Sequence, residues 1–172
     1  MDVRLAIASR REVRQYTAEP LREDVVERIL DAGRLAGSGQ NRQPWSFVVL
    51  ASRERVERLA SCVFAPDNVL GAALVVAIVV RGKGPVTFDA GRASQNMLLQ
   101  AWADGVGACP NGIADADGAR DVLELNSEEE RVVIVLGFGY AARPRDPSSR
   151  SADEWSGRSN RRPLEDVVRH LA

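Results

Sequence analysis

Three short apolar runs limit the folds that are open to this chain. They are Ser46–Ala51 (SFVVLA), Leu74–Val80 (LVVAIVV) and Arg131–Gly137 (RVVIVLG). Each has the length of a buried strand and is too short to cross a membrane as a helix. Between and before them lie segments with the apolar spacing of helices, at 24–36, 53–63, 88–104 and 115–125. Strands mixed with helices, with no internal repeat, predict an α+β fold in one domain over 1–172.

The two ends of the chain and one glycine-rich segment are less regular. Asp2 can cap a first short helix, and Gly37 is suited to end the helix predicted at 24–36. Gly105–Gly112 reads as a loop or a short irregular strand. From about 141 to 172 the chain is a polar arm, for which we predict one last short helix at Pro163–Leu171.

Composition and charge limit the classes of molecule that this protein is expected to bind. The net charge of −1 argues against attraction of the whole protein to nucleic acid or to an anionic membrane surface. The two cysteines, Cys62 and Cys109, form no CxxC pair, and the N-terminus lacks the apolar run of a signal peptide. We therefore expect a cytoplasmic protein with free thiols, no nucleic-acid partner and no membrane partner.

The single histidine, His170, stands two residues from the end of the sequence. One histidine cannot form an HExxH zinc site, and a base at a chain terminus is a poor member of a catalytic triad. We expect no metal site, and any difficult chemistry would come from a bound cofactor.

Two basic clusters are candidates for binding a phosphate, because a guanidinium group can donate two parallel hydrogen bonds to phosphate oxygens. The first is Arg10, Arg11 and Arg14, and the second is Arg161 with Arg162. The alternative for both clusters is a solvated basic surface, and the residues of the first cluster alone favour that alternative.

Two polar or small-residue segments could contact a flat heterocycle. In Ser38–Trp45, the side chains of Ser38, Asn41 and Gln43 can donate to and accept from a uracil-like edge. An ordinary helix end followed by a polar turn explains this segment equally well. In Gly107–Gly112, small residues allow backbone N–H groups close to a ligand. Cys109 within it has no nearby base, which favours an inert thiol over a nucleophile.

A dinucleotide fingerprint at 137–142 can be discarded. The letters GFGYAA follow a strand and match GxGxxA, but the fingerprint needs a helix to begin at its glycines. Arg143–Pro147 (RPRDP) is incompatible with that helix.

Taken in order, four segments resemble motifs of the nitroreductase family. SRREVRQY (9–16) resembles the opening RRSxRxF, and ILDAGRLAGSGQNRQPWSFVVL (29–50) resembles ILEAARxAPSxxNxQPWxFVVV. FDAGRASQNMLLQAWADGVGACPNGI (88–113) resembles DxGxAxQNxLLxAxxxGLGxCxxG. RRPLEDVVRH (161–170) resembles the terminal basic segment followed by PLEEVV. The order and spacing of the four motifs carry the resemblance, which covers 9–169.

The resemblance implies an α+β sandwich with a central, mostly antiparallel sheet flanked by helices, in an interleaved homodimer with FMN at the interface. Arg10, Arg11 and Arg14, joined by Arg161 or Arg162, would hold the phosphate and neighbouring oxygens. Ser38, Asn41 and Gln43, from the other subunit, would face the flavin. Pro110, Asn111 and Gly112 would lie along the isoalloxazine, with backbone N–H groups near N5 and O4.

The same resemblance implies a ping-pong oxidoreductase. NADH or NADPH would reduce the flavin, and a nitroaromatic, a quinone or a related acceptor would then be reduced on the same face, with no catalytic side chain. The chain departs from the family pattern at Glu12, at Gly37 and in the short link at 81–87. Three alternatives stay open: a noncatalytic flavin-binding or sensing module, a deazaflavin-dependent relative, and a flavin-assisted dehalogenating relative.

Overall fold

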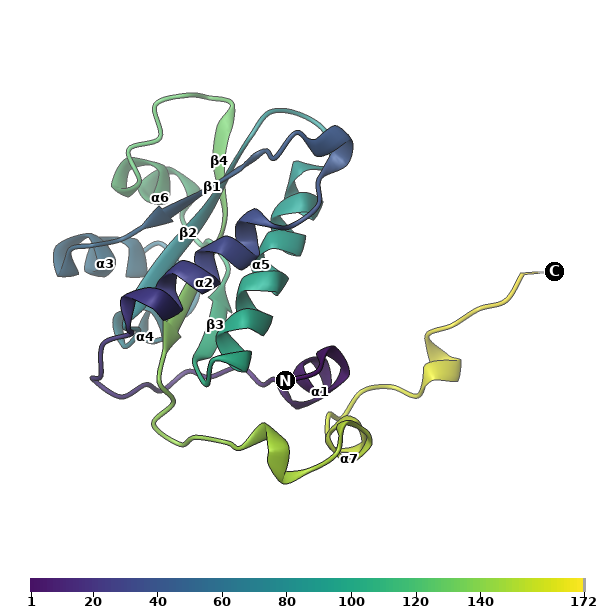
Figure 1. Ribbon diagram of the computed structural model, residues 1–172. Helices are drawn as coiled ribbons and strands as arrows, with labels where there is room; N and C mark the ends of the chain where they lie inside the picture. Colours follow the sequence, from purple (N-terminus) through teal and green to yellow (C-terminus); the bar gives the residue numbers. More distant parts are fainter. Residues whose placement is uncertain (172) are drawn as a thin grey trace. The chain divides into compact units, whose positions relative to one another are not determined.

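The computed structural model describes residues 1–171, which form two compact units (Figure 1). The larger unit, residues 11–144, contains α2 (Glu23–Arg34), η1 (Gly39–Asn41), β1 (Trp45–Val49), α3 (Arg53–Ala60), α4 (Pro66–Leu70), β2 (Leu74–Arg81), α5 (Val86–Ala103), β3 (Gly107–Asn111), α6 (Ala116–Val122) and β4 (Glu130–Gly139). The smaller unit joins residues 1–10 to 145–171 and contains α1 (Val3–Ser9), η2 (Pro147–Ser149), α7 (Ala152–Gly157) and η3 (Leu164–Asp166).

The four strands form one antiparallel sheet in the order β1-β2-β4-β3. The three predicted strands are confirmed, and Gly107–Asn111, predicted as a loop or an irregular strand, is the regular edge strand β3. In the register, Trp45 of β1 faces Val80 of β2, and Asn111 of β3 faces Val135 of β4. The prediction of an α+β fold with an antiparallel sheet is therefore confirmed.

Both faces of the sheet are covered by helices. Val76, Ile78 and Val80 of β2 belong to a core with residues of α2 and α5, whereas Val75, Ala77 and Val79 belong to a core with residues of α3 and α6. Figure 1 shows α2 and α5 side by side against the sheet. Because β2 is buried on both faces, its sequence is a continuous apolar run instead of an alternating one.

Helix α2 packs closely on α5 through Gly33. A Cβ at this position would lie 2.8 Å from the Phe47 ring and 2.9 Å from Met97, so only glycine fits without a shift. The helix ends at Arg34 with Leu35 as its C-cap, two residues before the predicted end, and Gly37 is not the capping residue.

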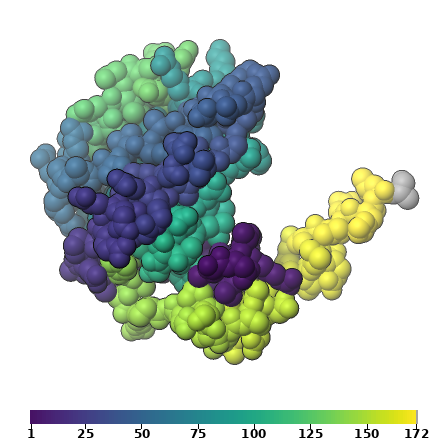
Figure 2. All heavy atoms as spheres, viewed as in Figure 1, coloured from purple at the N-terminus to yellow at the C-terminus, as the bar shows by residue number. Residues whose placement is uncertain are grey.

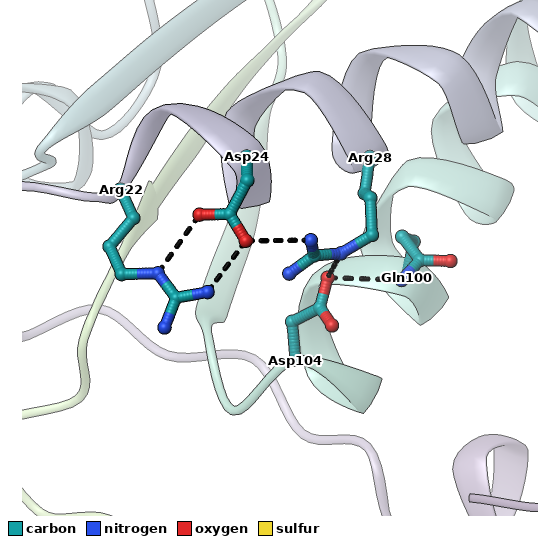
Figure 3. A network of polar contacts seen from close by, with 5 residues as sticks. All are labelled: Arg22, Asp24, Arg28, Gln100 and Asp104. Carbon is teal, nitrogen blue, oxygen red and sulfur yellow. Dashed lines mark hydrogen bonds and ion pairs between the residues drawn. The ribbon is translucent and has the colours of Figure 1, made fainter.

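A polar network joins the start of α2 to the end of α5 (Figure 3). Arg28 Nε lies 3.0 Å from Asp104 Oδ2, and Gln100 Nε2 donates to the same oxygen. Arg22 and Arg28 both donate to Asp24, and these hydrogen bonds hold the pKa of the Asp24 carboxyl well below its usual range. Arg22, Asp24 and Arg28 are exposed, so the ion pairs of Asp24 contribute little to stability, whereas Asp104 is half-buried.

The smaller unit has its own apolar contacts. Asp2 caps α1, as predicted, and α1 packs on α7. Trp155 of α7 is buried; its indole Nε1 donates to the carbonyl of Pro147 over 2.8 Å, and Arg150 lies 4.9 Å from the ring centroid.

The predicted helix at Pro163–Leu171 is wrong. The structure has only the short turn η3, and Figure 2 shows this segment extending away from α1 and α7. Short helices are stabilised mainly by packing of an apolar face, and Leu164 and Val167 are exposed here. No helix within 1–171 is both long and apolar enough to cross a membrane.

Candidate functional site

The first arginine segment lies along the outer edge of β3. The Val13 N–H donates to the carbonyl of Ala108 over 3.0 Å, and Glu12 forms an isolated parallel bridge with Ala108. A Cβ on Gly107 would lie 2.6 Å from Val13, so glycine permits this approach. Arg11 is half-buried and Arg14 is exposed on the same segment. The structure therefore brings two predicted phosphate ligands to the strand that carries Pro110 and Asn111.

Tyr16 anchors the other end of this segment. Its hydroxyl lies 2.6 Å from the carbonyl of Val13 and 3.2 Å from that of Gly137 in β4. Burial of the phenol raises the pKa of Tyr16, with smaller contributions from Cys109 and Glu12. Tyr16 stays a neutral donor at physiological pH, so main-chain and phenol contacts help to fix the arginine segment.

The side chain of Asn111 points into the protein. Asn111 is 3% exposed; its Nδ2 donates to the carbonyl of Cys109 over 3.1 Å, and its Oδ1 accepts from Asn68 Nδ2 over 3.0 Å. Asn68 Nδ2 also lies 3.6 Å from the buried Cys109 sulfur. Only the backbone of Asn111 can therefore face a ligand. Sequence analysis did not identify Asn68, which is 43 residues away in the chain.

Phe64 stands beside the end of β3. Its N–H donates to the carbonyl of Gly112 over 3.1 Å, and a Cβ on Gly112 would lie 3.2 Å from its ring. The side chain is 77% exposed, which places a flat apolar surface next to Gly112. Sequence analysis did not identify this residue either.

The second predicted segment has an unusual backbone. Gln40, Asn41 and Gln43 have positive φ angles of 54°, 55° and 49°, a region that non-glycine residues rarely occupy. Ser38 Oγ accepts from the Gln43 N–H over 2.8 Å, and Asp89 of α5 accepts from the Gly39 N–H over 3.3 Å. Such strain persists only when neighbouring contacts fix the conformation, and it is common at ligand sites.

We expect replacement of Asp89 by alanine to loosen the loop. Removing a hydrogen bond to a buried carboxylate should speed exchange of the Gly39 amide by about tenfold, measured by hydrogen exchange with NMR detection. Arg92→Ala is the matched control, because it removes the ion pair of 3.9 Å with Asp89 and leaves the bond to Gly39. Equal exchange rates in the two variants would contradict the anchoring role of Asp89.

The two predicted contact segments lie at opposite edges of the sheet. The loop of Ser38, Asn41 and Gln43 leads into β1, whereas Pro110 and Asn111 are in β3. Three strand spacings separate these edges, or about 14 Å.

The β1 edge carries two hollows. The larger, of about 850 Å³, has an apolar floor of Leu30, Trp45 and Phe47 with charged residues of α2 at its rim. The smaller, of about 450 Å³, lies between the loop before β1 and the link from β2 to α5. Gln43 and Trp45 line both hollows.

The remaining predicted phosphate ligands belong to the other unit. Arg10 is half-buried, and Arg161 and Arg162 are exposed, all three in the smaller unit. Convergence of these residues with Arg11 and Arg14 on one phosphate stays a prediction.

Comparison with known proteins gives consistent matches. The model of the nitroreductase family matches residues 7–83 and 85–140. A Methanothermobacter thermautotrophicus protein, provisionally named NADH dehydrogenase/NAD(P)H nitroreductase, is 32% identical over 152 positions, covering 83% of this chain and 78% of its own. An NADH dehydrogenase of Thermus thermophilus is 27% identical, covering 98% and 95%. A provisionally named nitroreductase of Desulfovibrio desulfuricans, solved in complex with FMN, is 28% identical with a TM-score of 0.83, covering 100% and 98%.

Proposed function

Because this chain belongs to the nitroreductase family, we propose that it is an FMN-dependent oxidoreductase that carries hydride from NADH or NADPH to a nitroaromatic, a quinone or a related acceptor. The names of two relatives include NADH dehydrogenase, and one similar structure contains FMN. Both cysteines are buried thiols, which supports a cytoplasmic location.

The observation that carries the proposal is the separation of the two contact segments on the sheet. Arg11 and Arg14 run along β3, and the strained loop of Asn41 and Gln43 leads into β1, at the opposite edge. The two segments would face one flavin from both sides if they came from two copies of the chain. We therefore propose a homodimer with each FMN site shared between subunits.

The residues present fit FMN. Arg11 and Arg14 supply the cations that a phosphate monoester requires, and Asn41 and Gln43 expose amides that can pair with the pyrimidine edge. Phe64 and the backbone of Pro110–Gly112 offer a flat surface at the β3 edge, the same edge as Arg11 and Arg14. When bound, FMN would supply the two-electron chemistry that these side chains lack.

The role of the protein in this proposal is binding and electrostatics. The arginines would hold the phosphate, and backbone N–H groups at the end of β3 would stabilise negative charge on a bound ring. Asn68 and Asn111 fix that end of β3 from behind. No side chain acts as a general acid, and the reductant leaves before the acceptor binds, which is a ping-pong order.

A visible absorption spectrum before and after anaerobic NADH or NADPH tests the function. We expect a yellow protein that bleaches with the reductant and regains its colour when a quinone or nitroaromatic is added. Colour without bleaching would instead identify a noncatalytic flavin-binding module. A colourless protein that takes up no FMN would overturn the proposal, and mass analysis of the released cofactor distinguishes FMN from a deazaflavin.

A further inference from the structure

The smaller hollow at the β1 edge, here called the Lys83 pocket, has no role in the function proposed so far. It has a volume of about 450 Å³, and its lining includes Arg42, Gln43, Trp45, Arg81, Lys83 and Glu130. The Arg81 N–H donates to the carbonyl of Pro44 over 2.9 Å, which joins the end of β2 to the loop before β1. Figure 1 shows η1 near the start of α5, where this pocket lies.

The Lys83 pocket is basic. Four cationic side chains lie in it or beside it, and two carboxylates accompany them: Arg42, Arg81, Lys83 and Arg131, with Glu129 and Glu130. Arg81 is paired with Glu129 over 3.3 Å, and Arg131 donates to the carbonyl of Gly82. Lys83 makes no hydrogen bond or ion pair with any residue of 1–171, so its ammonium group is available to an anion.

The backbone around Lys83 is adapted to this position. Gly82 and Gly84 have φ angles of 97° and 90°, which side chains of L-residues rarely adopt. The two glycines form a tight link between β2 and α5, and the exposed Lys83 stands between them.

The pocket also has features that suit a nucleotide. The half-buried Trp45 offers part of an indole face for a base, next to Pro44. Gln43 lies at its border and belongs to the loop that we assign to the flavin. A ligand in the pocket would therefore extend toward the proposed flavin site. Excess positive charge and an aromatic wall favour a phosphorylated nucleoside over a neutral acceptor.

We propose that the Lys83 pocket binds the adenosine 2′-phosphate of NADPH and makes NADPH the preferred reductant. This inference rests on the proposed function, because it assumes a nicotinamide nucleotide as electron donor. NADPH and NADH differ only in that phosphate, which carries close to two negative charges at neutral pH. Lys83 and Arg42 line the pocket and can turn to it without breaking an ion pair, whereas Arg81 is paired with Glu129.

The direct test is calorimetric binding of two probes to the purified flavin-loaded protein. Adenosine 2′,5′-bisphosphate should bind at least tenfold more tightly than 5′-AMP, because charge-assisted hydrogen bonds are strong. The difference should shrink at high salt, since the pocket is open to solvent. The double variant Lys83→Ala with Arg42→Ala should bind both probes equally. Arg53→Ala is the control, because Arg53 pairs with Glu57 on α3 and should leave the preference unchanged.

Anaerobic reduction kinetics provide the second measurement. The ratio of NADPH to NADH reduction rates at low nucleotide concentration should fall about tenfold in the double variant. Equal binding of both probes by the unmodified protein would overturn the assignment of the pocket. Bleaching at equal rates by NADH and NADPH would also overturn it, while leaving the proposed function intact. Absence of any bleaching would count against the proposed function, and the probe titration would still decide whether the pocket binds the 2′-phosphate.

Discussion

Replacing Arg10 together with Arg14 by alanine should release FMN from a protein that still folds. Each guanidinium is expected to make a charge-assisted contact to the phosphate, worth about 1.5–3 kcal/mol. Loss of both should weaken FMN binding by roughly two to four orders of magnitude. The segment itself should stay in place, because the Val13 N–H and the Tyr16 hydroxyl fix it to β3 and β4. Flavin content and fluorescence titration measure the loss, and thermal melting reports the fold.

The matched control for this variant is Arg53→Ala with Arg58→Ala. Both residues are exposed on α3, so the net charge changes by the same amount away from the proposed site. We expect this control to retain its flavin. Full flavin occupancy in the variant lacking Arg10 and Arg14 would contradict the phosphate role of the segment. A lower melting temperature in that variant alone, measured after the flavin has been removed from both proteins, would indicate a structural role instead.

Local patterns predicted most of the regular structure. The continuous apolar run at Leu74–Val80 indicated a buried strand, and β2 is covered on both faces by helices. A helix was correctly predicted at 24–36. The observed helix ends two residues earlier than predicted, because Leu35 and not Gly37 is its C-cap. The helix predicted at Pro163–Leu171 failed because the apolar residues of that segment have no surface to pack on in the smaller unit.

The order of the motifs did not reveal how they are arranged in space. Asp89 and Gly39 are 50 residues apart, and no local pattern links a carboxylate in α5 to an amide in the loop before β1. The pair of Asn68 with Asn111 was missed for the same reason. The strand order had the largest effect, because it places β1 and β3, and with them the two predicted contact segments, at opposite edges of the sheet.

The last segment of the chain has features of a subunit contact. Its apolar residues are exposed, with Leu164 at 73%, Val167 at 51% and Leu171 at 90%. Contiguous exposed apolar side chains commonly mark a protein interface. Arg161 and Arg162, the predicted phosphate ligands, lie in the same segment.

Deleting residues 160–172 is therefore expected to convert the proposed dimer to a monomer and to release FMN at the same time. A stop after Ser159 keeps α7, so Trp155 retains its bond to Pro147 and α1 retains its packing partner. A stop after Pro144 would also remove α7, the packing partner of α1. Unfolding of the smaller unit could then not be distinguished from loss of the dimer. Sedimentation velocity and flavin content, measured on the same sample, follow both effects.

A second variant separates the two roles of this segment. Arg161→Ala with Arg162→Ala removes the charges and keeps the apolar residues, so we expect a dimer with weakened FMN binding. If the apolar residues hold the subunits together, only the deletion should yield monomers. A flavin-loaded dimer of residues 1–159 would show that the segment takes part in neither contact. In that case the subunits would have to meet through another surface, such as the hollow floored by Leu30, Trp45 and Phe47.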